Sequence, residues 1–145
     1  MSHSLVLGTF YEGAPYVSAL VHLPEYNLGG IVAFQVDTGA DLTMLCPADA
    51  ERLGINYASL PIPVQVGSIG SQVLVHAVES VLTFTALDEL TQFQTALVVL
   101  NPSTSNLERS LLGMDVIRRC TLFAMSDLMS IEPAEVDGWL SRRTG

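Results

Sequence analysis

The sequence contains no lysine and few charged residues of any kind. Its 145 residues include 15 acidic side chains and six arginines, which gives a formal net charge of -9. Binding to nucleic acid needs a basic surface, and binding to anionic membranes needs a basic segment. The composition therefore argues against nucleic acid and membrane partners, and a net charge of this size also favours solubility.

Long apolar runs and a cysteine framework are missing as well. No apolar stretch approaches the roughly eighteen residues that a membrane-spanning helix needs. No Lys or Arg precedes the short apolar run near the N-terminus, so we expect no cleavable signal peptide. The two cysteines, Cys46 and Cys120, are too few for a disulfide framework and lack metal-ligand spacing. We therefore expect reduced thiols in a cytoplasmic protein.

Several motifs of metal and nucleophile chemistry are also absent. The three histidines, His3, His22 and His76, are scattered and form no His-x-x-x-His pair, so a zinc site is not expected. His22 and His76 are expected on strand faces or at the surface. The segment 66–70 does not form the Gly-x-Ser-x-Gly turn of serine hydrolases, and no glycine-rich phosphate loop is present. We expect neither a metal nor a cofactor.

Apolar residues, by contrast, make up 49% of the chain. This content is high for a free monomer and indicates that a partner covers part of the surface. The length is that of one domain. Residues 16–23 alternate, with Val17, Ala19, Val21 and Leu23 on one face, which predicts a half-buried strand.

The same reasoning predicts an all-β domain with few helices. Further strands are predicted at residues 5–10, 31–36, 43–45, 64–66, 73–86, 93–100, 111–113 and 120–125, and short helices at 47–54 and after 132. About eight strands with one or two short helices indicate a closed all-β architecture. We expect the domain to span residues 1–125, with residues 126–145 as a C-terminal extension.

The most informative stretch begins where the apolar run Ile31–Val36, which predicts a buried strand, stops. Asp37, Thr38 and Gly39 follow it directly, and a second apolar piece, Thr43–Leu45, comes soon after. Gly39 permits a tight turn, and Thr38 can hydrogen-bond backbone groups across it. A carboxylate between two apolar arms is costly to bury unless it is paired or hydrogen-bonded, and functional sites use such settings. The alternative is an Asx-turn in which Asp37 only solvates the loop.

This stretch resembles the active-site loop of aspartic proteases, specifically of the retroviral-type (retropepsin-like) branch. In that family an apolar pair precedes Asp-Thr-Gly, which Ala or Ser usually follows. Here the motif reads Val36, Asp37, Thr38, Gly39 and Ala40. The resemblance covers about residues 4–125 at the level of pattern, and it implies that Asp37, Thr38 and Gly39 form the catalytic loop of a closed acid-protease barrel.

A hairpin in the middle of the chain adds to the resemblance. The arms Val64–Val66 and Val73–Val75 flank a glycine-bearing tip, which taken alone predicts an ordinary hairpin. Retropepsin-like enzymes place a glycine-rich flap at this distance after Asp-Thr-Gly, where it closes over the bound peptide. The resemblance implies that Gly67, Ile69 and Gly70 contact substrate.

A third piece is Leu111-Leu112-Gly113. A buried strand that ends at a glycine would account for these residues equally well. In the family such a piece crosses beside the Asp-Thr-Gly loop and a short helix follows it, which implies a helix at Asp115–Arg119. Retroviral enzymes carry Arg directly after this glycine, where it supports the dimer. This chain has Met114 instead, so that electrostatic support is lacking.

The resemblance implies a function and a partner. Only one Asp-Thr-Gly is present, whereas the chemistry uses two carboxylates that share a proton. The second Asp37 would therefore come from a second chain, and the strand at 120–125 would offer its edge to that dimer. Ala40 and Asp41 would bind substrate, although Asp41 is equally compatible with a solvated loop acid. The prediction is a homodimeric aspartic endopeptidase acting on peptides or proteins, and the alternative is a non-catalytic peptide-binding or scaffolding module.

Overall fold

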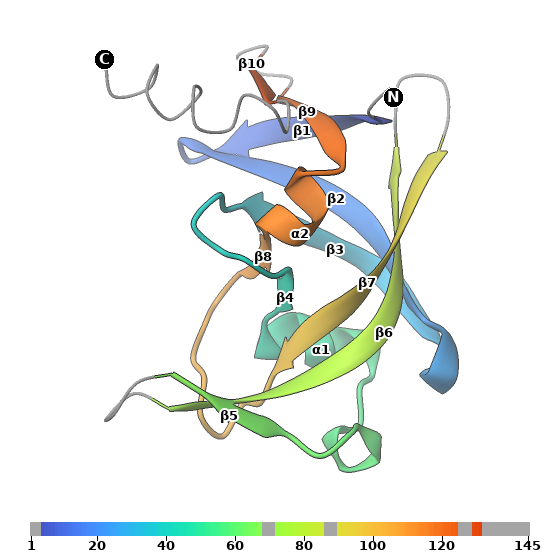
Figure 1. Cartoon of the computed structure of the whole chain (residues 1–145), viewed down its shortest axis with the longest axis vertical. Helices are drawn as coiled ribbons and strands as arrows, with labels where there is room; N and C mark the ends of the chain where they lie inside the picture. The colour runs from blue at the N-terminus through green and yellow to red at the C-terminus, as the bar shows by residue number, and fades with distance from the viewer. Residues whose placement is uncertain (1–3, 68–71, 86–89, 125–128, 132–145) are drawn as a thin grey trace.

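A computed structural model describes residues 4–67, 72–85, 90–124 and 129–131 of the chain (Figure 1). Within these residues the strands are β1 (Ser4–Tyr11), β2 (Ala14–Leu23), β3 (Leu28–Val36), β4 (Met44–Leu45), β5 (Val64–Val66), β6 (Val73–Thr85), β7 (Leu90–Leu100), β8 (Ser110–Leu112), β9 (Cys120–Ala124) and β10 (Met129–Ile131). The helices are α1 (Pro47–Leu53) and α2 (Met114–Ile117), with 3-10 turns η1 (Pro24–Tyr26) and η2 (Tyr57–Ser59). No helix among the described residues is long and apolar enough to cross a membrane.

Six strands form a closed barrel. They follow one another in the order β2, β3, β8, β4, β7 and β6, and the pairing of β6 with β2 closes the ring. Figure 1 shows α1 and α2 at opposite ends of the barrel interior, below and above β4 and β8. The predicted closed all-β architecture is confirmed.

The predicted faces of the strands are confirmed for β2 and need a correction for β3. In β2 the four residues predicted to share a face are all buried, and the residues between them are exposed. β3 begins at Leu28, earlier than expected, and alternates in the same way, so that Ile31 is 58% exposed. A strand in the wall of a barrel has one inner and one outer face, so an uninterrupted apolar run does not make it buried on both.

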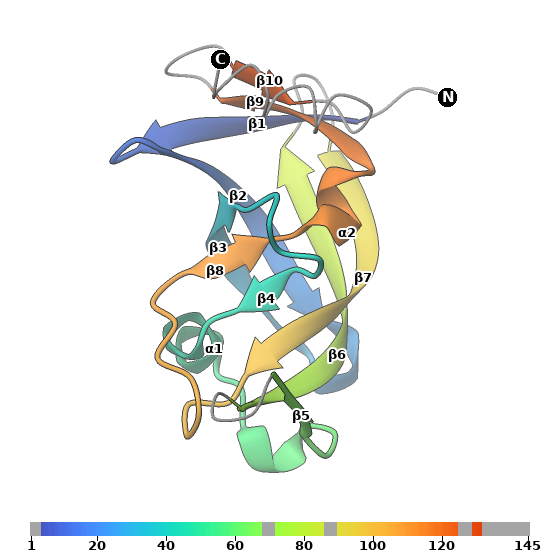
Figure 2. The same cartoon turned by 60° about the vertical axis from the view of Figure 1, so that its left-hand side comes forward.

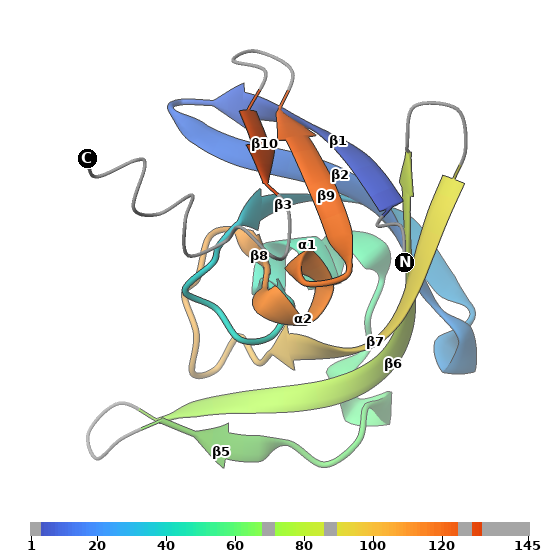
Figure 3. The ribbon, with the colours of Figure 1, turned by 45° about the horizontal axis from the view of Figure 1, so that its top comes forward.

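The end sheet beside the barrel, seen in Figure 3, corrects a second expectation. β9 pairs with β1 in parallel and with β10 in antiparallel fashion. Residues 120–124 therefore have in-chain partners on both sides, and the expectation that this strand offers a free edge to a second chain is wrong. Its neighbour β10 stands at the end of the strand order instead.

The predicted crossing of the Leu-Leu-Gly piece is confirmed. β8 runs parallel to β3 on one side and antiparallel to β4 on the other, so the loop from β3 to β4 must pass over the end of β8 (Figure 2). Backbone hydrogen bonds fasten the two together: Asp37 N donates to Leu112 O at 3.0 Å and Met114 N donates to Ala40 O at 2.8 Å. A Cβ at Gly113 would lie 2.4 Å from the carbonyl carbon of Leu42, so the crossing requires glycine.

The two predicted helices are confirmed near their expected bounds. α1 has Pro47 in its first turn and ends at Gly54, whose φ of 87° lies in the left-handed region that favours glycine. α2 begins directly after Gly113 and one residue earlier than expected. The predicted hairpin is also present, with Val64 opposite Val75 and Val66 opposite Val73.

The close contact at the crossing predicts that Gly113→Ala strongly destabilises the fold. The backbone of Leu42 blocks the new methyl group, and overpacking of this kind costs typically about 1–3 kcal/mol. We expect a loss near the upper end of that range in the free energy of unfolding, measured by urea denaturation.

Gly13→Ala is the matched control. Gly13 has a φ of +81° and nothing within 4 Å of an added Cβ, so that substitution tests backbone strain alone, at about 1 kcal/mol. A smaller loss from Gly113→Ala than from Gly13→Ala would contradict the close contact at the crossing.

Candidate functional site

The loop after β3 holds Asp37 in a tight turn. Its Oδ1 accepts a hydrogen bond from Gly39 N at 2.9 Å, and its carbonyl oxygen accepts one from Ala40 N at 3.1 Å. The Asx-turn considered from the sequence is therefore present. The side chains of Asp37 and Thr38 are half-buried, and Gly39 is exposed. Within the described residues the Asp37 carboxylate accepts only this one hydrogen bond, which leaves it available to a ligand or a second chain.

A buried threonine supports this loop from behind. Thr43 is 0% exposed. Its hydroxyl accepts from Gly113 N at 3.1 Å and donates to Asp115 Oδ1 at 2.7 Å. The other carboxylate oxygen of Asp115 accepts from Thr43 N and from Thr95 Oγ1, each at 3.2 Å. The carboxylate of Asp115, on α2, thereby joins the loop at Thr43 to β7 at Thr95.

No motif in the sequence indicated this role for Asp115. Its position two residues after Gly113 was the available signal, because a residue there follows the crossing immediately. The carboxylate also accepts a hydrogen bond from Val116 N at 2.9 Å. It is thus fully committed to fixing the loop and is not a free acid beside Asp37.

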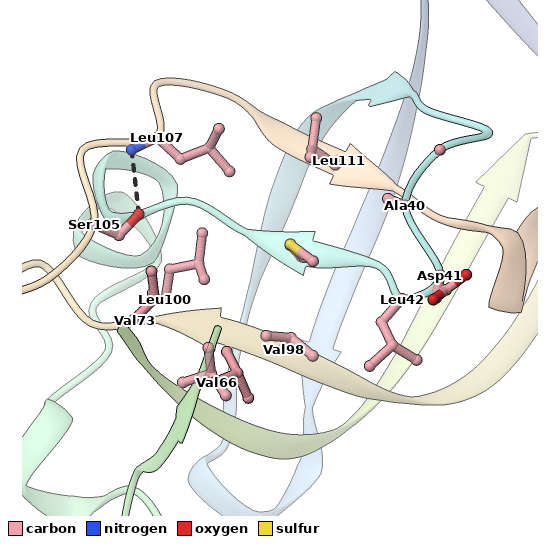
Figure 4. Close-up of a pocket in the computed structure, with 13 residues that line it drawn as sticks. Ala40, Asp41, Leu42, Val66, Val73, Val98, Leu100, Ser105, Leu107 and Leu111 are labelled. Carbon is pink, nitrogen blue, oxygen red and sulfur yellow. Dashed lines mark hydrogen bonds between the residues drawn. The ribbon is translucent and has the colours of Figure 1, made fainter. Parts of the chain in front are cut away.

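A cavity of about 600 Å³ begins at the same loop (Figure 4). Nearly all of its lining is aliphatic. The residues that line it are Gly39, Ala40, Asp41, Leu42, Met44, Val66, Val73, Val75, Val98, Leu100, Ser105, Leu107 and Leu111. Among these, Asp41 carries the one charge, and Ser105 Oγ is engaged by Leu107 N at 3.2 Å. The cavity therefore suits uncharged, apolar groups.

The β5–β6 hairpin contributes a valine surface to this cavity. Residues directly opposite each other in an antiparallel pair point to the same face of the sheet. The pairs Val64–Val75 and Val66–Val73 therefore share one face, and three of these four side chains line the cavity. Val64 is 61% exposed and Val66 is 47% exposed, so this face has apolar surface to offer to a ligand.

The structure brings some of the predicted site residues together and not others. Ala40 and Asp41 line the cavity, while Asp37 and Thr38 lie just before its lining in the same loop. Gly67 directly follows β5 with a φ of 119°, a conformation that favours glycine, but it is not part of the lining. Ile69 and Gly70, and the predicted helix after residue 132, lie outside the described residues.

Cysteines and metal-binding groups play no visible part in this site. Cys46 and Cys120 are both free and buried, and burial raises the pKa of the Cys120 thiol to about 12. A thiol with such a pKa stays protonated and unreactive. Among the described residues, no three His, Cys, Asp or Glu side chains gather in a way that could hold a metal ion.

Comparisons with known proteins agree with this geometry. A family model described as aspartyl protease matches residues 25–116. The structure is similar to EIAV protease complexed with the inhibitor HBY-793, with a TM-score of 0.50 and 19% identity over 75% of this chain and 91% of that chain. It is also similar to a retropepsin-like aspartic protease from Rickettsia conorii, with a TM-score of 0.51 and 20% identity over 79% of this chain and 77% of that chain. No curated protein matches the chain.

The hydrogen bonds of the Thr43 hydroxyl behind the loop predict that Thr43→Val lowers the free energy of unfolding. Valine keeps the shape but leaves the buried Gly113 N–H without an acceptor, which costs about 1–3 kcal/mol. We expect a loss of this size in the free energy of unfolding. Thr83→Val is the control, since its hydroxyl only accepts an exposed hydrogen bond from Gln92, and it should change stability by less than about 0.5 kcal/mol. Equal losses from the two variants would contradict the role of Thr43.

Proposed function

Because the chain belongs to the aspartyl protease family, we propose that it is an endopeptidase in which Asp37 supplies the catalytic carboxylate. Thr38 and Gly39 complete the catalytic loop. Ala40, Asp41 and the β5–β6 hairpin, including Gly67, Ile69 and Gly70, bind the peptide. No metal or cofactor is needed for this chemistry.

One observation carries the proposal. The half-buried carboxylate of Asp37 has a single in-chain hydrogen bond, from Gly39 N, and the next residues of its loop form the wall of the aliphatic cavity. A reactive acid is thus held beside a surface that accepts apolar side chains. A peptide with aliphatic residues around the scissile bond is the substrate that this surface favours.

The reaction requires a second carboxylate. Two carboxylates close together share one proton, because like charges at about 3 Å cannot both ionise. One of them accepts a proton from water while the other protonates the carbonyl oxygen or the leaving amine. The nearby Asp115 is already committed to Thr43 and Thr95. We therefore propose that the partner is Asp37 of a second copy, related by a two-fold axis.

The dimer would use surfaces other than the edge of β9, which is occupied in the chain. Among the described strands the end sheet stops at β10, and a strand at the end of a sheet can pair with another chain. Met114 carries no charge at the position after Gly113, so we expect association to depend on apolar burial more than on salt. A domain at residues 1–125, with residues 126–145 as an extension, and a cytoplasmic location remain predictions.

Asp37→Asn tests the catalytic role. Asparagine has nearly the same shape but cannot exchange a proton, and loss of general acid–base catalysis costs about 10²–10⁴-fold. We expect the rate of hydrolysis of an unfolded protein or an apolar peptide to fall by at least this factor. The free energy of unfolding and the sedimentation behaviour should stay unchanged.

Two controls separate catalysis from peptide binding. Glu79→Gln removes an exposed acid on β6 and should leave the rate unchanged, and a statine-type transition-state mimic should block the wild-type protein. A wild-type protein that binds apolar peptides but never cleaves them would favour the non-catalytic binding module. Hydrolysis by Asp37→Asn at the wild-type rate would show that the assignment is wrong.

A mixing experiment tests the shared dyad. With a ninefold excess of Asp37→Asn chains, random pairing leaves about a tenth of the wild-type chains in wild-type dimers. Activity per wild-type chain should fall to about that fraction, and specific activity should also fall on dilution. The same excess of an unrelated acidic protein is the control. A species that sediments as a monomer and keeps full activity in the mixture would rule out the dimer.

A further inference from the structure

A row of side chains on the outer face of the barrel continues the cavity wall. Residues that pair in neighbouring strands point to the same face of a sheet. The row consists of paired residues of β7, β4, β8, β3 and β2, which in that order are Val98, Met44, Leu111, Gln35 and Tyr16. The first three line the cavity. Gln35 and Tyr16 stand one and two strands beyond it, so the aliphatic wall passes directly into a more polar surface.

Gln35 places a free amide at the edge of the cavity. Its side chain is half-buried, and it forms no hydrogen bond among the described residues. The amide has an acceptor oxygen and two donor hydrogens. Its neighbour on β8 is Leu111, a residue of the cavity wall. The Gln35 amide is therefore available to a polar group of a ligand whose apolar part fills the cavity.

Arg109 brings a positive charge to the same place. It comes directly before Ser110, which pairs with Phe34 of β3. Its guanidinium carbon lies 6.0 Å from the ring centroid of Tyr16 on β2, on the other side of β3. The side chain must therefore cross the outer face of β3 close to Gln35, which is the partner of Tyr16 on that strand. The chain on both sides of Arg109 contributes leucines to the cavity wall (Figure 4).

The guanidinium of Arg109 keeps its hydrogen-bond donors free. Its one ion pair among the described residues, with Glu12, spans 3.9 Å, which is too long for a hydrogen bond. The two side chains are 47% and 66% exposed, and exposed pairs of this kind contribute little. Tyr16, which packs edge-on against the ring of Tyr11, holds the guanidinium without using a donor. The planar group can therefore bind a carboxylate through two parallel hydrogen bonds.

We propose that Gln35 and Arg109 form a polar subsite that binds an acidic side chain of the substrate, next to the cavity that binds an aliphatic one. Side chains on the same side of an extended peptide are two residues apart, at about 6.6 Å. Gln35 and Tyr16 lie one and two strand spacings from Leu111, which is about 5–10 Å. A peptide with an aliphatic residue and, two positions away, Asp or Glu therefore matches both surfaces. This inference rests on the proposed function, because it assigns a specificity to the same substrate.

The charges around the two surfaces determine which side chain goes where. Asp41 is the one charged residue in the cavity lining, so it repels an acidic side chain from the cavity itself. At Gln35 a basic side chain would meet the guanidinium of Arg109, which repels it. Glu12 does not reverse this preference, because its carboxylate is mostly exposed and stays in water. The acid is therefore favoured at the polar subsite and the aliphatic group in the cavity.

Peptide binding to the Asp37→Asn chain tests the subsite without hydrolysis. The probes are blocked alanine peptides with a central valine and with Glu, Gln or Lys two positions before or after it. In one of the two orders the Glu peptide should bind about three- to tenfold more tightly than the Gln peptide, because an exposed ion pair contributes up to about fivefold and a bidentate pair more. The Lys peptide should bind most weakly. In heteronuclear NMR titrations, the side-chain signals of Gln35 and Arg109 should shift with the Glu peptide.

Arg109→Glu, made in the same Asp37→Asn chain, should invert the preference, so that the Lys peptide binds more tightly than the Glu peptide. A merely structural role of Arg109 would weaken all peptides alike. Arg118→Glu is the matched control, since it makes the same change in net charge at an exposed side chain with no contact among the described residues. It should keep the original order of affinities. Gln35→Leu should reduce the discrimination between the Glu and Gln peptides.

The outcomes separate this inference from the proposed function. Equal affinities of the Glu, Gln and Lys peptides for the Asp37→Asn chain would overturn the subsite and leave the proposed function standing. This comparison needs no substitution in the subsite, so it holds whether or not Arg109→Glu folds. A preference for the Glu peptide that persists in Arg109→Glu would also overturn the subsite. Failure of every peptide to bind would contradict the proposed function, and the subsite with it.

Discussion

The closure of the barrel and the position of Asp37 both depend on the crossing of the β3–β4 loop over the end of β8. β8 lies between β3 and β4, so the seven residues that connect β3 to β4 must cross its end. Gly113 lets the two backbones touch, and the carboxylate of Asp115 reaches back to fix Thr43. The barrel cannot close unless this crossing forms, and the crossing cannot form without holding Asp37 in place. The architecture and the position of Asp37 are therefore products of the same contact, and a change that loosens one must loosen the other.

The cavity has a different character from the loop beside it. The loop is held by hydrogen bonds between buried polar groups, which are directional and tolerate little displacement. The opposing walls are valine, leucine and methionine side chains from five strands and two loops, and their contacts are non-directional. Rigid geometry at Asp37 and adaptable packing around it are together compatible with the proposed site for apolar peptides.

The sequence could predict what is local. The alternation of β2 and the glycine that ends α1 follow from turns and periods within a few residues. The Leu-Leu-Gly crossing was implied only by the resemblance to the family, because the residues themselves fit a buried strand equally well. The walls of the cavity could not be predicted in the same way, because Val66, Val98 and Leu107 meet only after the barrel has closed. His76 was expected on a strand face or at the surface, but it is buried. The sequence could not predict this, because its partners Pro61 and Asn101 come from connections far away in the chain. β3 was expected to be a buried strand, because composition alone does not reveal which residues of a barrel strand point outward.

The pairing of β1 with β9 has a consequence for how the chain acquires its structure. Ser4 pairs with Cys120 and Gly8 pairs with Ala124, so β1 meets β2 early but must wait for its second neighbour, β9, until the chain has been made up to that strand. Contacts between such distant segments pay the full loop-closure entropy before they gain anything, and proteins rich in them fold slowly. Until β9 is synthesised, the paired edge of β1 stays open to other chains. The topology therefore leaves one edge of β1 without its partner for as long as β9 has not been made.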